Sequence, residues 1–284
     1  MKIAALQWDV RRADVAANLA AARDGLSRAR EQGVQLLLLP EMWATSFPDA
    51  GDDLRAMTRM AQEAALRLSE DSARLDVDWA GSGFAFDAVP AAAARPFNRL
   101  ELFSRGERHF AYDKLHLFGP MAEDGVFQPG AALPTSVPWR GLRLSGVICY
   151  DLRFPEATRA PFHDGAELLL VPAQWPSPRS SQWRALVHGL AASGQCFVLA
   201  CNRTGREIVA RRKLALDFPG NSLVVGPAGE TLAEGHGEAG LISAEIDATT
   251  AREWRRQVPV EHDLRRDIYG SPSKSSTSRD APMI

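Results

Sequence analysis

The strongest constraint on the fold is a nearly all-apolar run, Val34-Gln35-Leu36-Leu37-Leu38-Leu39, that ends at Pro40-Glu41. A strand with one solvated face would alternate apolar and polar side chains, whereas this run is apolar on both faces. We therefore predict a strand that is buried on both sides. A predicted strand at residues 3–8 and a predicted helix at residues 14–32, which stops before Gly33, precede it and complete a β–α–β unit.

Similar patterns continue along the chain, and no linker or internal repeat divides it. Amphipathic periodicity predicts further helices at residues 52–72, 156–163, 180–193 and 249–258. Short apolar runs between turn residues predict further strands at residues 79–86, 97–104, 108–112, 134–138, 142–149, 167–171, 196–201, 223–225, 231–233 and 240–246. We therefore expect one α/β domain over residues 1–265. The polar tail, 266–284, is expected to be partly disordered or packed on a partner subunit.

Composition narrows the classes of partner. The formal net charge is −2 and like charges do not cluster in long blocks, so we expect neither nucleic acid nor a membrane as a partner. No apolar run reaches the length of a membrane span, and the N-terminus does not resemble a signal peptide. The three cysteines are an odd number without metal-ligand spacing, so we expect free thiols in a reducing cytoplasm, no metal and no cofactor.

Two chemically active side chains stand where apolar runs end. Cys149 follows the run 144–148 and precedes polar residues and Pro155, which predicts a thiol at a strand-to-helix turn. Amides at a helix start favour a thiolate, so Cys149 is a candidate nucleophile, although free cysteines are more often inert core residues. Glu41 ends the run 34–39 and is either a salt-bridge or helix-start residue or a carboxylate of a functional site.

Lys114 follows a predicted hairpin strand, and taken alone it would be interpreted as a surface lysine. Together with Cys149 and Glu41 it makes a workable catalytic set. The thiolate attacks a carbon, the carboxylate transfers the thiol proton to a leaving nitrogen, and the ammonium lowers the thiol pKa. The same ammonium and the backbone N–H of Tyr150 would stabilise a tetrahedral oxyanion. His116 is expected to make a structural hydrogen bond.

Three segments resemble the signature regions of the nitrilase superfamily of carbon–nitrogen hydrolases, in that family's order. They are Leu39-Pro40-Glu41-Met42, Tyr112-Asp113-Lys114-Leu115-His116-Leu117-Phe118 and Gly146-Val147-Ile148-Cys149-Tyr150-Asp151-Leu152-Arg153-Phe154-Pro155-Glu156. The resemblance implies a four-layer αββα sandwich of two mixed sheets, a Glu41–Lys114–Cys149 triad and a homodimer or larger homo-oligomer. It also implies that Glu123 is a second glutamate that positions the lysine and the substrate nitrogen, although a simple loop carboxylate is the alternative.

The turn around Cys149 is most similar to the omega-amidase group, because the Cys-Trp-Glu pattern of true nitrilases is absent. We therefore favour an amide over a nitrile as the small-molecule substrate. Arg153 either pairs with a carboxylate on an omega-amide or is a structural arginine bonded to Glu156 or a helix end. Trp175, Phe47 and Tyr150 are expected to wall the pocket.

One segment departs from the family pattern. Leu190, Ser193 and Gly194 stand where the family commonly has the Arg, Glu and Asn of an Arg-Ala-x-Glu-Asn motif. This difference puts local support of the helix in doubt. The leading hypothesis is a thiol amidohydrolase that releases ammonia through a thioester; the alternatives are an N-carbamoyl hydrolase and a catalytically silent binding module.

Overall fold

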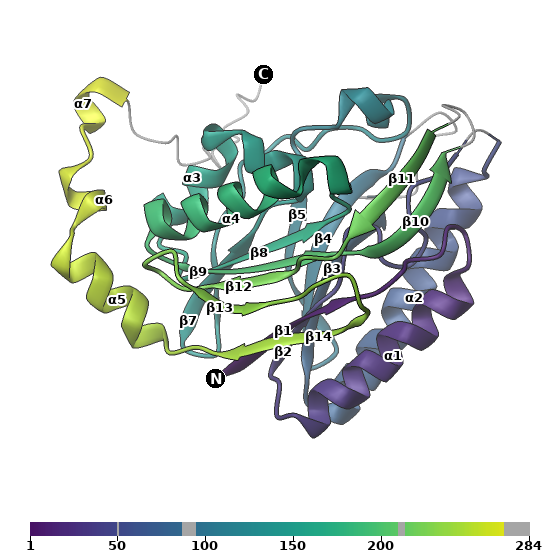
Figure 1. Ribbon diagram of the computed structural model, residues 1–284, viewed down its shortest axis with the longest axis horizontal. Helices are drawn as coiled ribbons and strands as arrows, with labels where there is room; N and C mark the ends of the chain where they lie inside the picture. The colour runs from purple at the N-terminus through teal and green to yellow at the C-terminus, as the bar shows by residue number, and fades with distance from the viewer. Residues whose placement is uncertain (50, 87–94, 210–213, 270–284) are drawn as a thin grey trace, which may run out of the picture.

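The computed structural model describes residues 1–49, 51–86, 95–209 and 214–269, and these residues form four layers (Figure 1). Two helices cover one face of a six-stranded sheet, and a second six-stranded sheet packs on its other face. Two further helices cover the outer face of the second sheet. The predicted αββα sandwich of two mixed sheets is confirmed.

The first sheet has the strand order β14-β1-β2-β3-β4-β5. Its central strands β1, β2 and β3 are parallel, and the outer pairs are antiparallel. The strands are β1 (Lys2–Gln7), β2 (Leu36–Leu38), β3 (Asp78–Ala85), β4 (Phe97–Ser104), β5 (Glu107–Asp113) and β14 (Gly240–Glu245). Helices α1 (Val15–Glu31) and α2 (Leu54–Leu75) lie on its outer face (Figure 1).

Local signals set the ends of α1. The side chain of Asp14 caps its first turn by accepting the backbone N–H of Ala17 at 3.1 Å. At the other end Gly33 has a φ of 72°, a conformation that favours glycine and that redirects the chain into β2.

Strand β2 is buried on both sides, as its apolar sequence predicts. Leu36 and Leu38 belong to the core between the two sheets, whereas Leu37 and Leu39 pack in the second core beneath α1 and α2. Successive side chains of a strand point to opposite faces, so one short run serves both cores. Because β2 lies in the middle of its sheet, the residues that follow it, Pro40 and Glu41, also emerge in the interior.

The second sheet has the order β13-β12-β9-β8-β7-β6, with β7, β8 and β9 parallel. Its strands are β6 (Val137–Trp139), β7 (Leu142–Gly146), β8 (Leu168–Ala173), β9 (Phe197–Asn202), β12 (Leu223–Val225) and β13 (Thr231–Glu234). Helices α3 (Pro155–His163) and α4 (Ser180–Gly194) cover it.

The strand before Cys149 is shorter than predicted. β7 ends at Gly146 rather than at residue 149, and Cys149 begins a 3-10 helix, η3 (Cys149–Arg153). The buried carboxylate of Asp151 accepts the backbone N–H of Ile148 at 3.2 Å, which draws the chain out of the sheet into this turn. The predicted strand-to-helix turn is confirmed, but the thiol belongs to the turn and not to the strand.

A hairpin of β10 (Thr204–Val209) and β11 (Leu214–Pro219) was missed in the sequence. It projects beyond the strands of the second sheet at the upper right of Figure 1. Its first strand mixes charged and apolar residues and exposes Ile208, so it lacks the continuous apolar run that marks the core strands.

The end of α4 at Leu190–Gly194, where the sequence departs from the family pattern, is stabilised by other contacts. Gly194 ends α4, and the ring of Phe162 lies where a larger side chain would be. The Arg255 guanidinium donates to the carbonyl oxygens of Gly194 and Gln195, each at 3.2 Å. An arginine from a later helix therefore satisfies the end of α4 without the family motif.

The chain continues through α5 (Ala248–Gln257), α6 (Val260–Asp263) and α7 (Arg266–Tyr269). The predicted tail begins in α7, and its Ser-rich part at 271–279 lies outside the described residues. Within the described ranges, no helix has both the length and the apolar character that a membrane span requires.

Candidate active site

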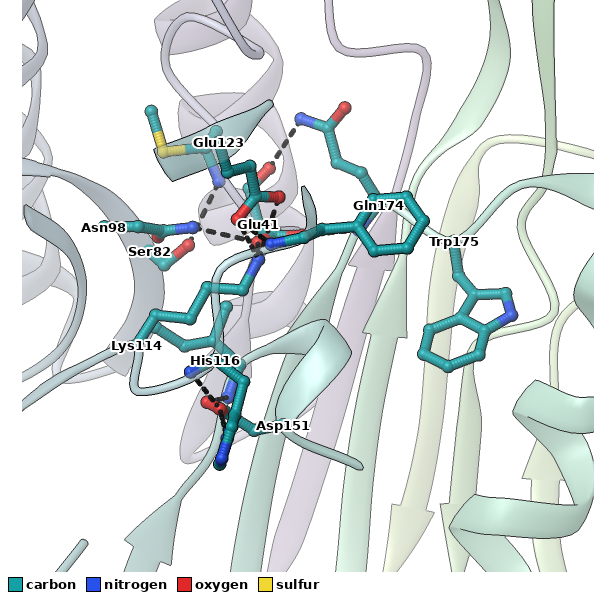
Figure 2. A network of polar contacts seen from close by, with 12 residues as sticks. Glu41, Ser82, Asn98, Lys114, His116, Glu123, Asp151, Gln174 and Trp175 are labelled. Atoms are coloured by element: carbon teal, nitrogen blue, oxygen red, sulfur yellow. Dashed lines mark hydrogen bonds and ion pairs between the residues drawn. The ribbon is translucent and has the colours of Figure 1, made fainter. Parts of the chain in front are cut away.

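Glu41 occupies the centre of a buried polar cluster (Figure 2). Its Oε1 accepts hydrogen bonds from Lys114 Nζ at 2.8 Å and from Asn98 Nδ2 at 2.9 Å. Its Oε2 accepts the backbone N–H of Gln174 at 3.0 Å, directly after β8. The Gln174 side chain also donates to the Glu41 carbonyl oxygen at 2.8 Å. Donors from both sheets therefore fix the carboxylate.

Lys114 follows β5 and lies between two carboxylates. Besides Glu41, its Nζ contacts Oε1 and Oε2 of Glu123 at 3.0 and 2.8 Å. Burial opposes the charge of Lys114, but Glu123 and Glu41 outweigh it and hold the pKa of the ammonium well above its ordinary value. The ammonium is therefore a permanent positive charge inside the protein.

Glu123 reaches the lysine from an irregular loop. Two short 3-10 helices, η1 (Gly119–Met121) and η2 (Glu123–Gly125), shape this loop, and Phe118 N–H donates to Glu123 Oε2 at 3.1 Å. Burial raises the pKa of Glu123; Lys114 opposes the rise, and the nearby Glu41 adds to it. Glu123 is thus a contact of Lys114 rather than an isolated loop carboxylate.

Cys149 has a φ of 44°, in the left-handed region that non-glycine residues rarely adopt. Asp151 holds the turn: its Oδ1 accepts the backbone N–H of His116 at 2.9 Å, and its Oδ2 accepts the Tyr112 hydroxyl at 2.9 Å. His116 Nδ1 also lies 2.8 Å from Asp151 Oδ1 (Figure 2), and the His116 ring stacks on Phe154. The structural role predicted for His116 is confirmed.

The thiol of Cys149 lines the same pocket as the Glu41 carboxylate, whose negative charge acts on its pKa. Burial raises the pKa of the thiol well above its ordinary value, and Glu41 adds to the rise while Lys114 only partly opposes it. Lys114 therefore lowers the thiol pKa, as expected from the sequence, but burial and the Glu41 charge outweigh it, so the net shift of the pKa is upward.

A pocket opens above this cluster. Cys149, Glu41 and Glu123 lie in its lining, whereas Lys114 is buried behind them. The three residues predicted to wall it, Phe47, Tyr150 and Trp175, all line it, and so does Arg153. The missed hairpin supplies a further wall with Glu207, Val209, Leu216 and Phe218. Arg153 contacts Gln182 at 2.6 Å and faces the Trp175 ring, so it belongs to the pocket.

Sequence reasoning missed two contributors to the cluster. Gln174 directly follows an apolar strand that ends in Ala173, the same strand-end signal that marks Glu41, and that signal could have identified it. Arg203 gave no such signal, although its buried Nη1 donates to Gln174 Oε1 at 3.1 Å. In the part of the chain that the structure describes, no group of acidic, histidine or cysteine side chains is arranged to hold a metal ion.

The sequence profile of the carbon–nitrogen hydrolase family matches residues 2–256. This chain belongs to the carbon–nitrogen hydrolase family. The resemblance drawn from the three sequence segments is confirmed, and the protein is a hydrolase of carbon–nitrogen bonds other than peptide bonds.

Two curated members of the family are similar over most of their length. A 2-oxoglutaramate amidase of Bacillus subtilis is 31% identical over 278 residues, which cover 94% of this chain and 98% of that protein. The omega-amidase YafV of Escherichia coli K12 is 31% identical over 234 residues, which cover 81% of this chain and 84% of that protein.

Solved structures of a hydrolase from the same superfamily, the NitN amidase of Nesterenkonia sp. AN1, have the same fold. One superimposes with a TM-score of 0.82 at 30% identity and covers 95% of this chain and 98% of that chain. A mutant of that amidase shows covalent addition of the acetamide moiety of fluoroacetamide at its active site cysteine.

Proposed function

We propose that the protein is a thiol amidohydrolase that cleaves a small linear amide, and that an omega-amide of a dicarboxylate is the favoured substrate. The observation that carries the proposal is one buried carboxylate, Glu41, that is bonded to the Lys114 ammonium and lines one pocket together with Cys149. In the proposed reaction these groups serve as proton acceptor, fixed positive charge and nucleophile.

In the first half of the reaction, Glu41 takes the proton of the Cys149 thiol as the sulfur attacks the amide carbon. The carbonyl oxygen becomes negative in the tetrahedral intermediate. The charge of Lys114 and the backbone N–H of Tyr150 stabilise it. Glu41 then gives its proton to the amide nitrogen, the carbon–nitrogen bond breaks, and ammonia leaves a thioester on Cys149.

In the second half, Glu41 takes a proton from a water molecule that attacks the thioester carbon. A second tetrahedral intermediate collapses, the carbon–sulfur bond breaks, and the proton returns to the sulfur. The products are a carboxylate and the free thiol. The raised thiol pKa fits this sequence, because the sulfur is protonated at the beginning and end of each cycle.

Glu123 completes the arrangement by holding Lys114 on the side away from Glu41. It lines the same pocket, so its carboxylate is also placed to orient the nitrogen of a bound amide. Arg153 faces the pocket and is the candidate partner for a distal carboxylate. The similarity to an omega-amidase and to a 2-oxoglutaramate amidase supports an amide as the substrate class.

We further propose a homodimer or larger homo-oligomer, a domain boundary near residue 265 and a cytoplasmic location. The three cysteines are unpaired in the structure, which agrees with a reducing compartment. Sedimentation velocity of the full chain tests the assembly, and cell fractionation tests the location.

An ammonia-release screen over omega-amides, aliphatic amides, N-carbamoyl amino acids and nitriles tests the proposed function, with Cys149→Ala as the control. We expect the fastest release from omega-amides and none from the variant. Preferential release from carbamoyl compounds would make the protein an N-carbamoyl hydrolase instead. If no class of compound released ammonia, the protein would instead be a catalytically silent binding module.

A further inference from the structure

Among the residues that the structure describes, Arg12, Arg153 and Arg179 line the pocket, and their pairing differs. Arg12 Nη1 forms an ion pair with Asp52 at 2.7 Å. Arg153 donates a hydrogen bond to the neutral side-chain oxygen of Gln182. Within the described residues, neither Arg153 nor Arg179 has a carboxylate within ion-pair distance. The pocket therefore presents two positive charges that no carboxylate of the described residues pairs with.

Aromatic rings hold these two arginines in place. The Arg153 guanidinium lies 4.8 Å from the Trp175 ring centroid, and the Arg179 guanidinium lies 5.7 Å from the Phe118 ring centroid. Trp175 also fixes the backbone at Arg179, because its Nε1–H donates to the Arg179 carbonyl oxygen at 2.8 Å. One tryptophan thus supports both arginines, and stacked guanidiniums keep their N–H edges free for an anion.

The hairpin wall does not offset this charge. Glu207 faces the pocket, but its Oε2 already accepts Arg203 Nη1 at 2.6 Å and the Ser46 hydroxyl at 2.7 Å. At the base of the pocket, Glu41 and Glu123 share Lys114. Asp49, the remaining acidic residue among the described lining, is not free either. Within the described lining, the charge without an opposite partner is therefore positive, which favours an anionic substrate group.

We infer that Arg179 acts with Arg153 as a two-armed clamp for the distal carboxylate of the substrate. The inference rests on the proposed amidase function and deepens it by assigning substrate selection to a second residue. Two guanidinium forks surround a carboxylate more completely than one, and each can donate paired hydrogen bonds to its oxygens. A neutral amide gains nothing from the clamp.

Succinamate and butyramide make a matched test, because the second replaces the distal carboxylate of the first by a methyl group. Both are assayed by ammonia release with the wild type and with Arg179→Gln, Arg153→Gln and Arg179→Lys. We expect Arg179→Gln to raise KM for succinamate about ten- to one-hundred-fold and to leave kcat and butyramide turnover within about twofold. Arg179→Lys should restore part of the loss, because it keeps the charge without the fork.

Arg12→Gln is the control, because Arg12 lines the same pocket but is already paired. It should leave the ratio of succinamate to butyramide turnover unchanged. Equal losses on both substrates for Arg179→Gln, or no loss on either, would overturn the clamp while leaving the amidase function standing. If the wild type hydrolyses neither amide, the proposed function fails. The clamp can then still be tested by calorimetry, which compares the affinity of succinamate for Cys149→Ala with its affinity for the double variant that also carries Arg179→Gln.

Discussion

Two parts of the pocket differ in whether their charged side chains form ion pairs within the protein. The pocket floor is formed by Glu41, Lys114, Glu123 and Cys149; its three charged side chains are buried and paired with one another, and Cys149 is partly buried. The pocket mouth, formed by Arg153, Trp175, Arg179 and the β10–β11 hairpin, holds two half-buried guanidiniums that pair with no carboxylate of the described ranges. Each charged side chain at the floor is paired with another one there, whereas the guanidiniums of Arg153 and Arg179 at the mouth can pair with an anionic ligand.

The difference separates reaction from selection. In the proposed mechanism, groups at the floor contact the reacting atoms of any amide, so changes there should lower kcat for neutral and charged substrates alike. In the proposed clamp, groups at the mouth contact the distal end of a substrate, so changes there should alter KM for charged substrates. Butyramide and succinamate report on the two regions independently.

The largest effect is expected from Cys149→Ala. Without the sulfur no thioester can form, so ammonia release from both amides should fall by at least about 10⁴-fold. The melting temperature should remain close to that of the wild type, because the change removes one small side-chain atom. Residual turnover within tenfold of the wild type would place the nucleophile elsewhere.

Glu41→Gln should lower kcat by about 10²- to 10⁴-fold on both substrates, because an amide side chain cannot carry the proton between sulfur and nitrogen. Rapid-quench kinetics should show both thioester formation and its hydrolysis to be slow. A defect confined to succinamate would show that Glu41 acts in substrate selection and not in the reaction itself.

Lys114→Met should lower both activity and stability. The loss of the fixed charge should reduce kcat by about 10²- to 10³-fold on both amides. It also leaves Glu41 and Glu123 buried without their shared cation, which should reduce the free energy of unfolding by about 3–5 kcal/mol. Urea unfolding measures the second effect, and an unchanged midpoint would contradict the burial of this ion pair.

The raised pKa of Cys149 predicts a distinct pH dependence of alkylation. Because the thiol stays protonated above the ordinary thiol range, iodoacetamide should inactivate the substrate-free protein slowly near neutrality and faster as the pH rises. The rate should not level off below pH 9. A plateau near pH 7 would indicate a stable thiolate and a low pKa.

The smallest effect is expected at the mouth from Trp175→Phe. Phenylalanine keeps a ring under Arg153 but cannot donate to the Arg179 carbonyl oxygen. KM for succinamate should rise about three- to tenfold, with butyramide turnover unchanged. A larger loss on butyramide would show that Trp175 supports the floor instead.

The floor was largely predictable from the sequence, and the mouth only partly. Apolar runs gave the strands before Glu41 and Cys149, and buried strands of packed sheets deliver the residues after them to the interior. The direction of the thiol pKa shift was not predictable, because it depends on how completely the fold buries Cys149 beside Glu41.

The mouth depends on contacts that leave no local pattern. The hairpin lacks an apolar run, and Arg179 ends a short 3-10 helix, η4 (Ser177–Arg179), with no sequence signal that it faces the pocket. Arg153 was foreseen as a pocket candidate because it lies in the turn that carries the nucleophile. Which of its possible partners it contacts is decided by tertiary packing against Trp175 and Gln182.

Rapid acid quench of the wild type during butyramide turnover, followed by peptide mass spectrometry, tests the central claim most directly. The account predicts a mass increase of one butyryl group on the peptide that contains Cys149 and none on the peptides of Cys196 or Cys201. A butyryl group on either of those buried cysteines, or continued ammonia release with no acylated cysteine, would contradict it.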